Sequence, residues 1–164
     1  MKAHHKQHGF SLIELLIVVA IIGIIAAIAI PNLLASRRAA NEGSALSSLR
    51  TIYSSEMTYC ATTGLGDYGD LPTLSSATLT DSVIGSGSKS GYSFVATPSD
   101  PGVRPATFIV TANPITTSGA GKSGTRRFGI VQDGVLHGDS PATSALLGTP
   151  FIDTDLTSGN AINN

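Results

Sequence analysis

The sequence predicts an α+β fold in which one long N-terminal helix packs on a small antiparallel sheet of three to four strands. Three observations predict it: an apolar run over residues 10–31, an amphipathic pattern over residues 32–62, and short β-type segments between residues 92 and 137. With 164 residues, the chain has room for one domain once the apolar run is set aside.

The apolar run has the length and composition of a membrane-spanning helix. Between Phe10 and Ile30 the only charged side chain is Glu14, and Leu, Ile, Val and Ala fill most other positions. At about 1.5 Å of rise per residue, such a helix is roughly 30 Å long, the thickness of a bilayer's hydrocarbon core. A secretory signal peptide usually has a shorter apolar region that ends at a small-residue cleavage site. Here the small residue, Gly9, precedes the run.

Glu14 is unexpected in this run, because an ionised acid within hydrocarbon costs about 2–3 kcal/mol. If the chain is cut after Gly9, Phe10 gains an ammonium group, which the Glu14 carboxylate of a neighbouring subunit could approach. Two unit charges about 4 Å apart are worth about 4 kcal/mol at an effective dielectric constant near 20, which is comparable with that cost. Glu14 therefore fits an assembly better than a single chain. An acid tolerated near the membrane interface is the alternative.

The string GFSLIE at residues 9–14, followed by the apolar run and Pro31, resembles the N-terminal signature of type IV pilins and type II secretion pseudopilins. This is the class III signal peptide family. The resemblance implies that a prepilin peptidase cleaves between Gly9 and Phe10 and that the new Phe10 amine is N-methylated. Residues 1–9 would then be a basic leader peptide that is removed.

The resemblance also implies that Glu14, Gly23 and Pro31 serve in assembly. In that family, the region corresponding to Gly23–Pro31 loses helicity when subunits pack into a filament. Proline removes a backbone donor and clashes with the preceding turn, so a plain kink at the membrane surface is the alternative. The sequence does not separate the two.

The leader has two lysines, three histidines and no acid, and by the positive-inside rule it places the N-terminus in the cytoplasm. His4, His5 and His8 are not interpreted as a metal site, because a leader that is removed cannot hold a metal in the product. Without the leader lysines, acidic residues outnumber basic ones, so no basic footprint for nucleic acid is indicated.

Residues 32–62 are predicted to continue the helix as the amphipathic spine of a globular domain. Polar residues dominate its start, including Arg37, Arg38, Asn41 and Glu42. Apolar residues then recur at three- and four-residue spacing, which gives one stripe suited to packing against a sheet: Leu46, Leu49, Tyr53, Met57 and Cys60. Cys60 is the sole cysteine, so no intramolecular disulfide can form, and its place on the stripe predicts a buried side chain.

The rest of the chain is predicted as a loop, a sheet and a tail. Residues 63–91 form a long Gly-, Ser- and Asp-rich variable loop with one short helix near Ser75–Ile84. Residues 92–137 form the sheet, with strands over 92–96, 107–112 and 127–131 and a fourth over 135–137 after an Asp-Gly turn. Residues 138–164 form an irregular tail, in which Asp153 and Asp155 fall far short of a calcium ligand set.

No catalytic residue, metal site or cofactor is predicted, and the sequence is interpreted as a structural subunit. The resemblance implies a prepilin that polymerises with copies of itself into a type IV pilus-like filament, for adhesion, motility, DNA uptake or secretion. A type II secretion minor pseudopilin is the alternative within that class. A monomeric envelope enzyme or binding module, held by an uncleaved signal anchor, is the alternative of another class.

The expected location and partners follow from this interpretation. The precursor crosses the inner membrane once and contacts its lipid, and the product is an extracellular pilus or a periplasmic pseudopilus. The resemblance implies three partners besides the chain itself: prepilin peptidase, an inner-membrane assembly platform and the ATPase of that platform.

Overall fold

The computed structural model describes residues 10–138 and 160–161. These residues fall into two compact units, one up to Ser36 and one from Arg37 onward. The leader peptide with Gly9, its histidines, and most of the predicted tail with Asp153 and Asp155 lie outside the described residues.

The helix α1 (Leu12–Ala61) contributes to both units. It is assigned without a break through Gly23 and Pro31, where the sequence had suggested a kink or an opening. By length and composition, α1 is long enough and apolar enough to cross a membrane. It ends at Ala61, where the Gly64 amide donates to the Tyr59 carbonyl and closes the last turn.

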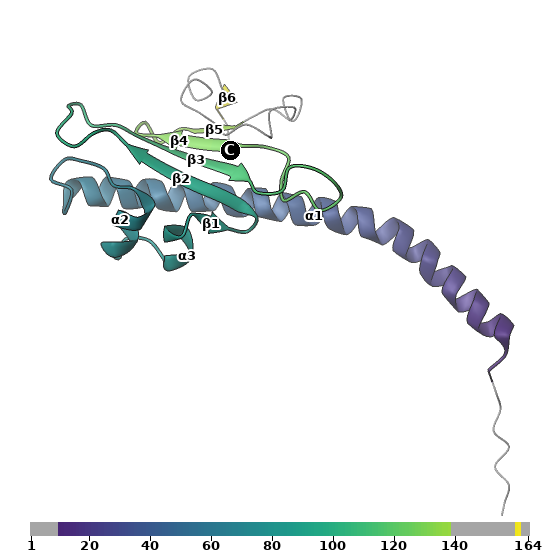
Figure 1. Ribbon diagram of the computed structural model, residues 1–164. Helices are drawn as coiled ribbons and strands as arrows, with labels where there is room; N and C mark the ends of the chain where they lie inside the picture. Colours follow the sequence, from purple (N-terminus) through teal and green to yellow (C-terminus); the bar gives the residue numbers. More distant parts are fainter. Residues whose placement is uncertain (1–9, 139–159, 162–164) are drawn as a thin grey trace, which may run out of the picture. The chain divides into compact units, whose positions relative to one another are not determined.

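In the second unit, an antiparallel sheet packs on α1 (Figure 1). Its strands follow one another in chain order: β1 (Ser88–Lys89), β2 (Tyr92–Pro98), β3 (Phe108–Pro114), β4 (Phe128–Val131), β5 (Leu136–Gly138) and β6 (Asn160–Ala161). The predicted α+β fold class is therefore confirmed. The sheet is wider than expected, because β1 and β6 pair at its two edges within segments predicted as loop and tail.

The turns of the sheet explain part of that difference. Ser90 and Gly91, which join β1 to β2, both have positive φ (50° and 74°), as a two-residue hairpin turn with the right-handed twist requires. This Ser-Gly turn lies within residues 63–91, which were predicted as a loop. Between β4 and β5, the predicted turn is present: Gly134 has φ 75° and the Val135 amide donates to Asp133 Oδ1 at 2.8 Å.

The single short helix predicted near Ser75–Ile84 is wrong, since two helices lie there: α2 (Leu71–Ser76) and α3 (Ser82–Gly85). Each begins after an aspartate whose side chain accepts a hydrogen bond from the third residue beyond it. Asp70 Oδ1 accepts from Thr73 N and Asp81 Oδ1 accepts from Ile84 N. Two capping aspartates within one loop are a signal for two helices.

The core lies between α1 and the inner face of the sheet. Matched rows of side chains cross the strands on that face: Phe94, Ala112 and Phe128 in one, and Ala96, Val110, Ile130 and Leu136 in the next. From α1, Ala45, Leu49 and Ile52 are fully buried. The predicted stripe is therefore shifted around the helix, and Leu46, Tyr53, Met57 and Cys60 are half-buried at its edge.

Candidate functional site

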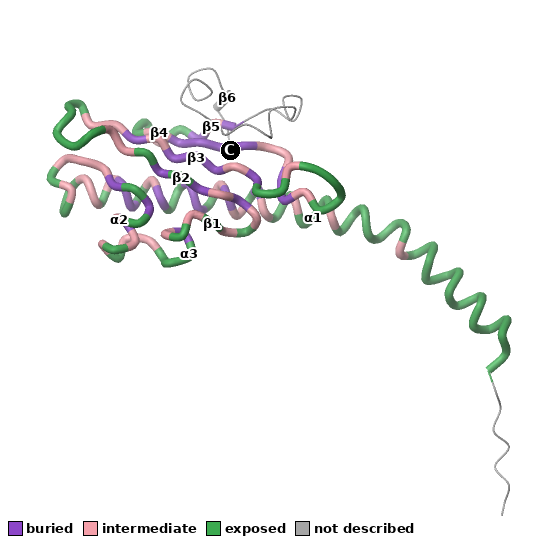
Figure 2. The backbone as a smooth tube through the Cα atoms, in the orientation of Figure 1, coloured by how far each residue is buried: buried purple, intermediate pink, exposed green. Residues whose placement is uncertain are grey.

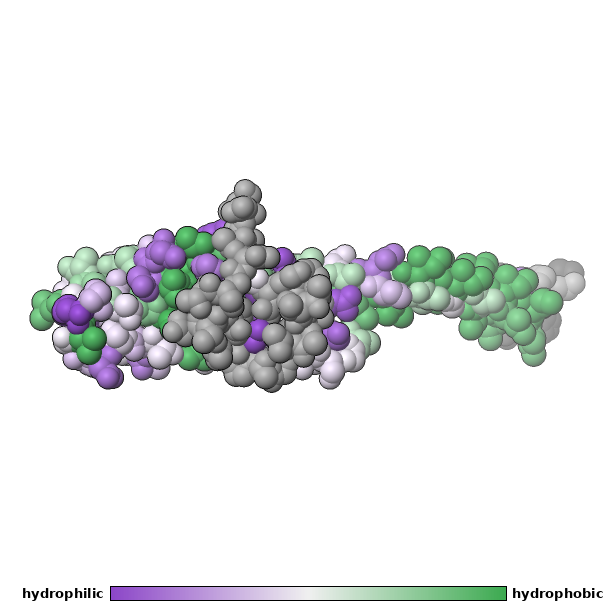
Figure 3. All heavy atoms as spheres, turned by 90° about the horizontal axis from the view of Figure 1, so that it is seen from above, coloured by the Kyte–Doolittle hydropathy of each residue, from purple (hydrophilic) through white to green (hydrophobic). Residues whose placement is uncertain are grey.

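The apolar segment, defined as residues 10–30, exposes almost every large side chain it carries (Figure 2). Phe10 is 86% exposed and Leu12 78% exposed, and they belong to a contiguous run of exposed apolar side chains, which is more informative than a single exposed one. Figure 3 shows that apolar residues gather over this part of α1. Exposed apolar surface of this extent indicates a membrane or protein contact.

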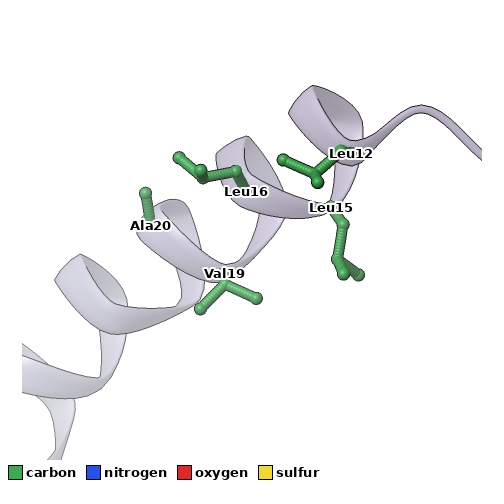
Figure 4. Close-up of a pocket in the computed structure, with 5 residues that line it drawn as sticks. All are labelled: Leu12, Leu15, Leu16, Val19 and Ala20. Atoms are coloured by element: carbon green, nitrogen blue, oxygen red, sulfur yellow. The ribbon is translucent and has the colours of Figure 1, made fainter.

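The side chains of the first turns show how this surface is built. Leu12, Leu16 and Ala20 follow one another along one side of the helix, and Leu15 and Val19 lie along another (Figure 4). Residues four apart lie one above the other on a helix, so apolar residues at nearly every position make several such rows. The helix therefore has apolar surface around its circumference and suits burial on all sides, in lipid or among other helices.

Glu14 has a local role that was not predicted. Its Oε2 accepts a hydrogen bond from the Ser11 backbone amide at 2.9 Å, just before α1 begins at Leu12. A glutamate at the third helical position that binds the amide of the residue before the helix is half of a capping box. The signal was readable as Ser-x-x-Glu at residues 11–14. Its negative charge in the first turn also interacts favourably with the positive end of the helix dipole.

The predicted site residues are distributed as follows. The Glu14 carboxylate binds the backbone amide of Ser11, the residue that follows Phe10. Gly23 and Pro31 lie further along the helix, and a Cβ at Gly23 would meet nothing within 4 Å. Gly9 lies outside the described residues. The roles of these residues in processing and assembly therefore stay predictions.

A second polar site, in the second unit, was not predicted. Glu42, one of the polar residues at the start of the predicted amphipathic helix, is 7% exposed. Its Oε1 accepts from Thr125 N and Thr125 Oγ1, at 2.8 and 2.7 Å, and its Oε2 accepts from Arg126 Nε at 3.0 Å. One carboxylate thus fixes the connection between β3 and β4 to α1. The three bonds satisfy this buried acid, and its removal would leave three donors without their acceptor.

Neighbouring contacts extend this connection. Asn41 Nδ2 donates to the Ser123 carbonyl at 2.8 Å, and the Tyr92 hydroxyl donates to the Arg126 carbonyl at 2.8 Å. A Cβ on Gly124 would overlap the Tyr92 hydroxyl and ring, so only glycine fits there. The connection between β3 and β4 is therefore held from both α1 and β2.

Glu56 is a second buried acid on α1, and it is fully buried. Its Oε2 accepts from Gly69 N at 3.0 Å, while its Oε1 has no hydrogen-bond partner among the described residues. Burial raises the pKa of Glu56 to about 7; the Gly69 bond lowers it and the nearby Asp70 charge raises it further. Both acids were detectable in the sequence, because Glu42 and Glu56 are in helical phase with the buried Ala45, Leu49 and Ile52.

In the part of the chain that the structure describes, no three His, Cys, Asp or Glu side chains come together as a metal site would require. The polar residues described above are instead bound to backbone groups and to one another. What the first unit offers chemically is an apolar contact surface with one carboxylate at its end.

Comparison with known proteins points to the same segment. The family described as "Prokaryotic N-terminal methylation motif" matches residues 4–30. The chain is 44% identical over 54 residues to the type IV major pilin protein PilA of Myxococcus xanthus, which is 33% of this chain and 24% of that protein. It is 71% identical over 34 residues to the type IV wide pilus major component PilA4 of Thermus thermophilus, 21% of this chain and 26% of that protein.

A secretion-system protein matches as well. The chain is 39% identical over 49 residues to the type II secretion system core protein G of Escherichia coli K12, 30% of this chain and 34% of that protein. The matched stretches thus span about a quarter to a third of these relatives' lengths. No solved structure matches the chain significantly. The resemblance to the type IV pilin and pseudopilin family is confirmed by these matches.

Proposed function

We propose that this chain is a structural subunit that polymerises through its apolar segment into a type IV pilus-like filament. The observation that carries the proposal is the exposed apolar surface of residues 10–30, which has the Glu14 carboxylate near its N-terminal end. The match of residues 4–30 to the methylation motif supports it, as does the similarity to pilins and protein G. In a filament this surface is buried against equivalent helices, which removes it from water and lipid.

Processing precedes assembly. Prepilin peptidase cleaves between Gly9 and Phe10, and the Phe10 amine is methylated. The new ammonium group then belongs to the residue directly before Ser11, whose backbone amide donates a hydrogen bond to Glu14. A carboxylate accepts at two oxygens, so Glu14 can hold its own cap and still pair with the Phe10 ammonium of a neighbouring subunit. That pairing offsets the cost of the acid in apolar surroundings. Gly23 and Pro31 are where we expect the helix to adjust during packing.

Before assembly, the precursor lies in the inner membrane with its N-terminus in the cytoplasm. The apolar segment has the length to cross the hydrocarbon core, so membrane lipid is its first partner. An assembly platform and its ATPase then move subunits into a pilus outside the cell or a pseudopilus in the periplasm. This chain supplies the contact surface and no chemistry of its own.

A pseudopilin of type II secretion is the second candidate, and the likeness to protein G favours it. The two candidates share processing and helix packing, and they differ in location: a pilus extends outside the cell, whereas a pseudopilus stays in the periplasm. A monomeric protein held by an uncleaved anchor is the remaining alternative. It gives Glu14 only its capping role.

The test is intact mass and N-terminal fragmentation of the protein from the sheared surface fraction. We expect a chain that begins at methylated Phe10, and Gly9→Ala should block cleavage. Glu14→Gln keeps an oxygen for the Ser11 amide but removes the charge, so it should abolish assembly without unfolding the domain. Ser36→Ala is the matched control, since its hydroxyl donates only within its own helix, to Asn32 O.

A chain that still begins at Met1 and stays in the membrane fraction would overturn the proposal and favour the anchored monomer. Processed subunits found in the periplasm and absent from the surface would favour the pseudopilus. Glu14→Gln subunits that assemble normally would limit Glu14 to its capping bond.

A further inference from the structure

Four basic residues gather at the end of the second unit where α1 enters it. We call them the basal cluster: Arg37, Arg38, Lys122 and Arg126. Arg37 and Arg38 precede Asn41 by four and three residues on α1, the spacings that place side chains on one helix face. Asn41 binds the Ser123 carbonyl at 2.8 Å, which brings Lys122 next to that face.

The segment that carries Lys122 has a built conformation. Thr116 N donates to Ser123 Oγ at 3.1 Å, and Ser123 N donates to Thr116 O at 2.9 Å. These bonds close residues 117–122 into a turn at the base of the unit. Ile115, just before the turn, is 56% exposed, so an apolar side chain accompanies the cation.

Among the acids of residues 37–138, only Glu42 pairs with a member of this cluster, Arg126. Glu42 is taken by Thr125 and Arg126, and Glu56 lies about four helical turns further along α1. Other aspartates are engaged elsewhere: Asp67 pairs with Arg104, and Asp81 lies 3.7 Å from Lys89 Nζ. Within residues 10–138, neither Arg37, Arg38 nor Lys122 forms an ion pair. These three cations are therefore left without an acidic partner in the described residues; Arg37 is exposed, and Arg38 and Lys122 are half-buried.

The cluster also lies close to the membrane by chain length alone. Arg37 follows Ile30, the end of the apolar segment, by seven residues. That is about 10 Å along a helix and at most about 25 Å for an extended chain. The headgroup region adds about 5–8 Å outside each face of the hydrocarbon core. Arginine side chains extend towards the interface with their charged ends in the polar layer, so Arg37 reaches lipid phosphates.

We propose that the basal cluster binds the phosphate groups of anionic lipids in the leaflet from which the chain emerges, and so holds the turn of residues 117–122 against the membrane before assembly. The inference rests on the proposed function only in requiring that residues 10–30 cross a membrane. Each cation near an anionic surface strengthens such binding about fivefold, and the effect fades within a Debye length. Assembly then requires that these contacts be released.

The test measures hydrogen exchange in the full-length chain after insertion into preformed vesicles. One set contains phosphatidylcholine alone, and the other contains phosphatidylglycerol as about a third of the lipid. We expect amide exchange in residues 115–124 to slow about tenfold in the anionic vesicles at low salt and to recover at high salt. Lys122→Glu and Arg37→Glu should each remove most of this protection.

Arg50→Glu is the matched control, because Arg50 is exposed on the same helix but outside the cluster. It should keep the protection. Unchanged exchange in β3 shows that each variant is folded. Equal exchange of residues 115–124 in both vesicle types would overturn the proposal. Protection that appears in both and rises with the protein-to-lipid ratio would also overturn it, because it would identify a second copy of this chain as the partner.

The experiment uses unassembled subunits, so it reads lipid contact whether or not filaments form. Failure of filament assembly with intact lipid protection would count against the proposed function alone. Loss of lipid protection with normal filaments would count against this inference alone.

Discussion

The two parts of α1 solve opposite problems with one helix. In the part up to Ile30, leucine and isoleucine side chains are exposed, whereas in the part after Arg37 two glutamates are buried. The buried acids have partners from the loops of the second unit, while the exposed apolar residues have no covering element within residues 10–138. The second part is therefore covered by its own chain, whereas the first part is left to be covered by lipid or by another molecule.

The largest expected effect comes from truncating one leucine in each part. Leu49 is fully buried, so Leu49→Ala removes packing and leaves a cavity, and we expect it to lower the free energy of unfolding by about 2–5 kcal/mol. Leu16 is 61% exposed, so Leu16→Ala should leave it unchanged. Denaturant unfolding in detergent, followed by tyrosine fluorescence, measures both. Equal losses would contradict the division between the two parts.

The pH dependence of stability tests the buried acid Glu56. Its pKa rises from 4.5 to about 7 on folding, so the folded state binds more protons than the unfolded state between these values. Stability should therefore fall as the pH rises from about 4.5 to 7, by about 3 kcal/mol in total. Unfolding at a series of pH values measures it. Glu56→Gln should remove this slope while retaining an oxygen for the Gly69 amide.

Two aspartates act in the opposite direction at lower pH. Hydrogen bonding from the Arg104 side chain lowers the pKa of Asp67 below 3.8, and bonds from Thr73 lower that of Asp70. Their contribution is present above about pH 4 and is lost as the pH falls further. If stability rose continuously from pH 4 to 8, the burial of Glu56 would be contradicted.

A smaller loss is expected from Glu42→Ala. The change leaves Thr125 N, Thr125 Oγ1 and Arg126 Nε without their acceptor, and Arg126 is partly open to water, which limits the loss. We expect the free energy of unfolding to fall by about 2 kcal/mol. Faster hydrogen exchange in residues 115–126, with Arg50→Ala as the exposed control, locates the effect. A loss spread evenly over the sheet would argue against a local clamp.

The smallest expected effect is a gain. Thr78 follows α2 with φ 58°, a left-handed conformation that a β-branched residue rarely adopts and that glycine adopts without strain. Thr78→Gly should raise the melting temperature by a few degrees, for about 0.5–1 kcal/mol. Thr58→Gly, in the interior of α1, is the comparison and should lower it. Opposite changes in melting temperature would show that the effect of glycine depends on the backbone conformation at each position.

The sequence predicted the parts of the fold that repeat a pattern. Apolar residues at helical spacing and β-branched segments located α1, β2, β3 and β4 to within a few residues. It did not predict β1 or β6, because a two-residue strand carries no periodicity and is held by its neighbour. The predicted apolar stripe was displaced to one side of the buried face of α1. Tyr53 and Met57 are large but lie at the edge of the core, whereas Ala45 is small and fully buried.

The candidate site was predictable where the chemistry is local. The apolar segment and Glu14 were found from composition, and the capping bond to Ser11 was visible as a Ser-x-x-Glu spacing that was not used. The buried Glu42 depends on Thr125 and Arg126, which lie far away in the sequence. No local pattern of α1 predicts such partners, because they follow from how the sheet returns the chain to the helix.

The pairing of β5 with β6 brings His137 and Gly138 beside Ala161 and Asn160. Cys60 is the sole cysteine of the sequence, so this join between distant parts of one chain is made by backbone hydrogen bonds and by no covalent cross-link. Oxidant supply and reducing agents therefore leave it untouched. The same closure forms in a reducing or an oxidising compartment, and maturation of the domain needs no disulfide-forming enzyme.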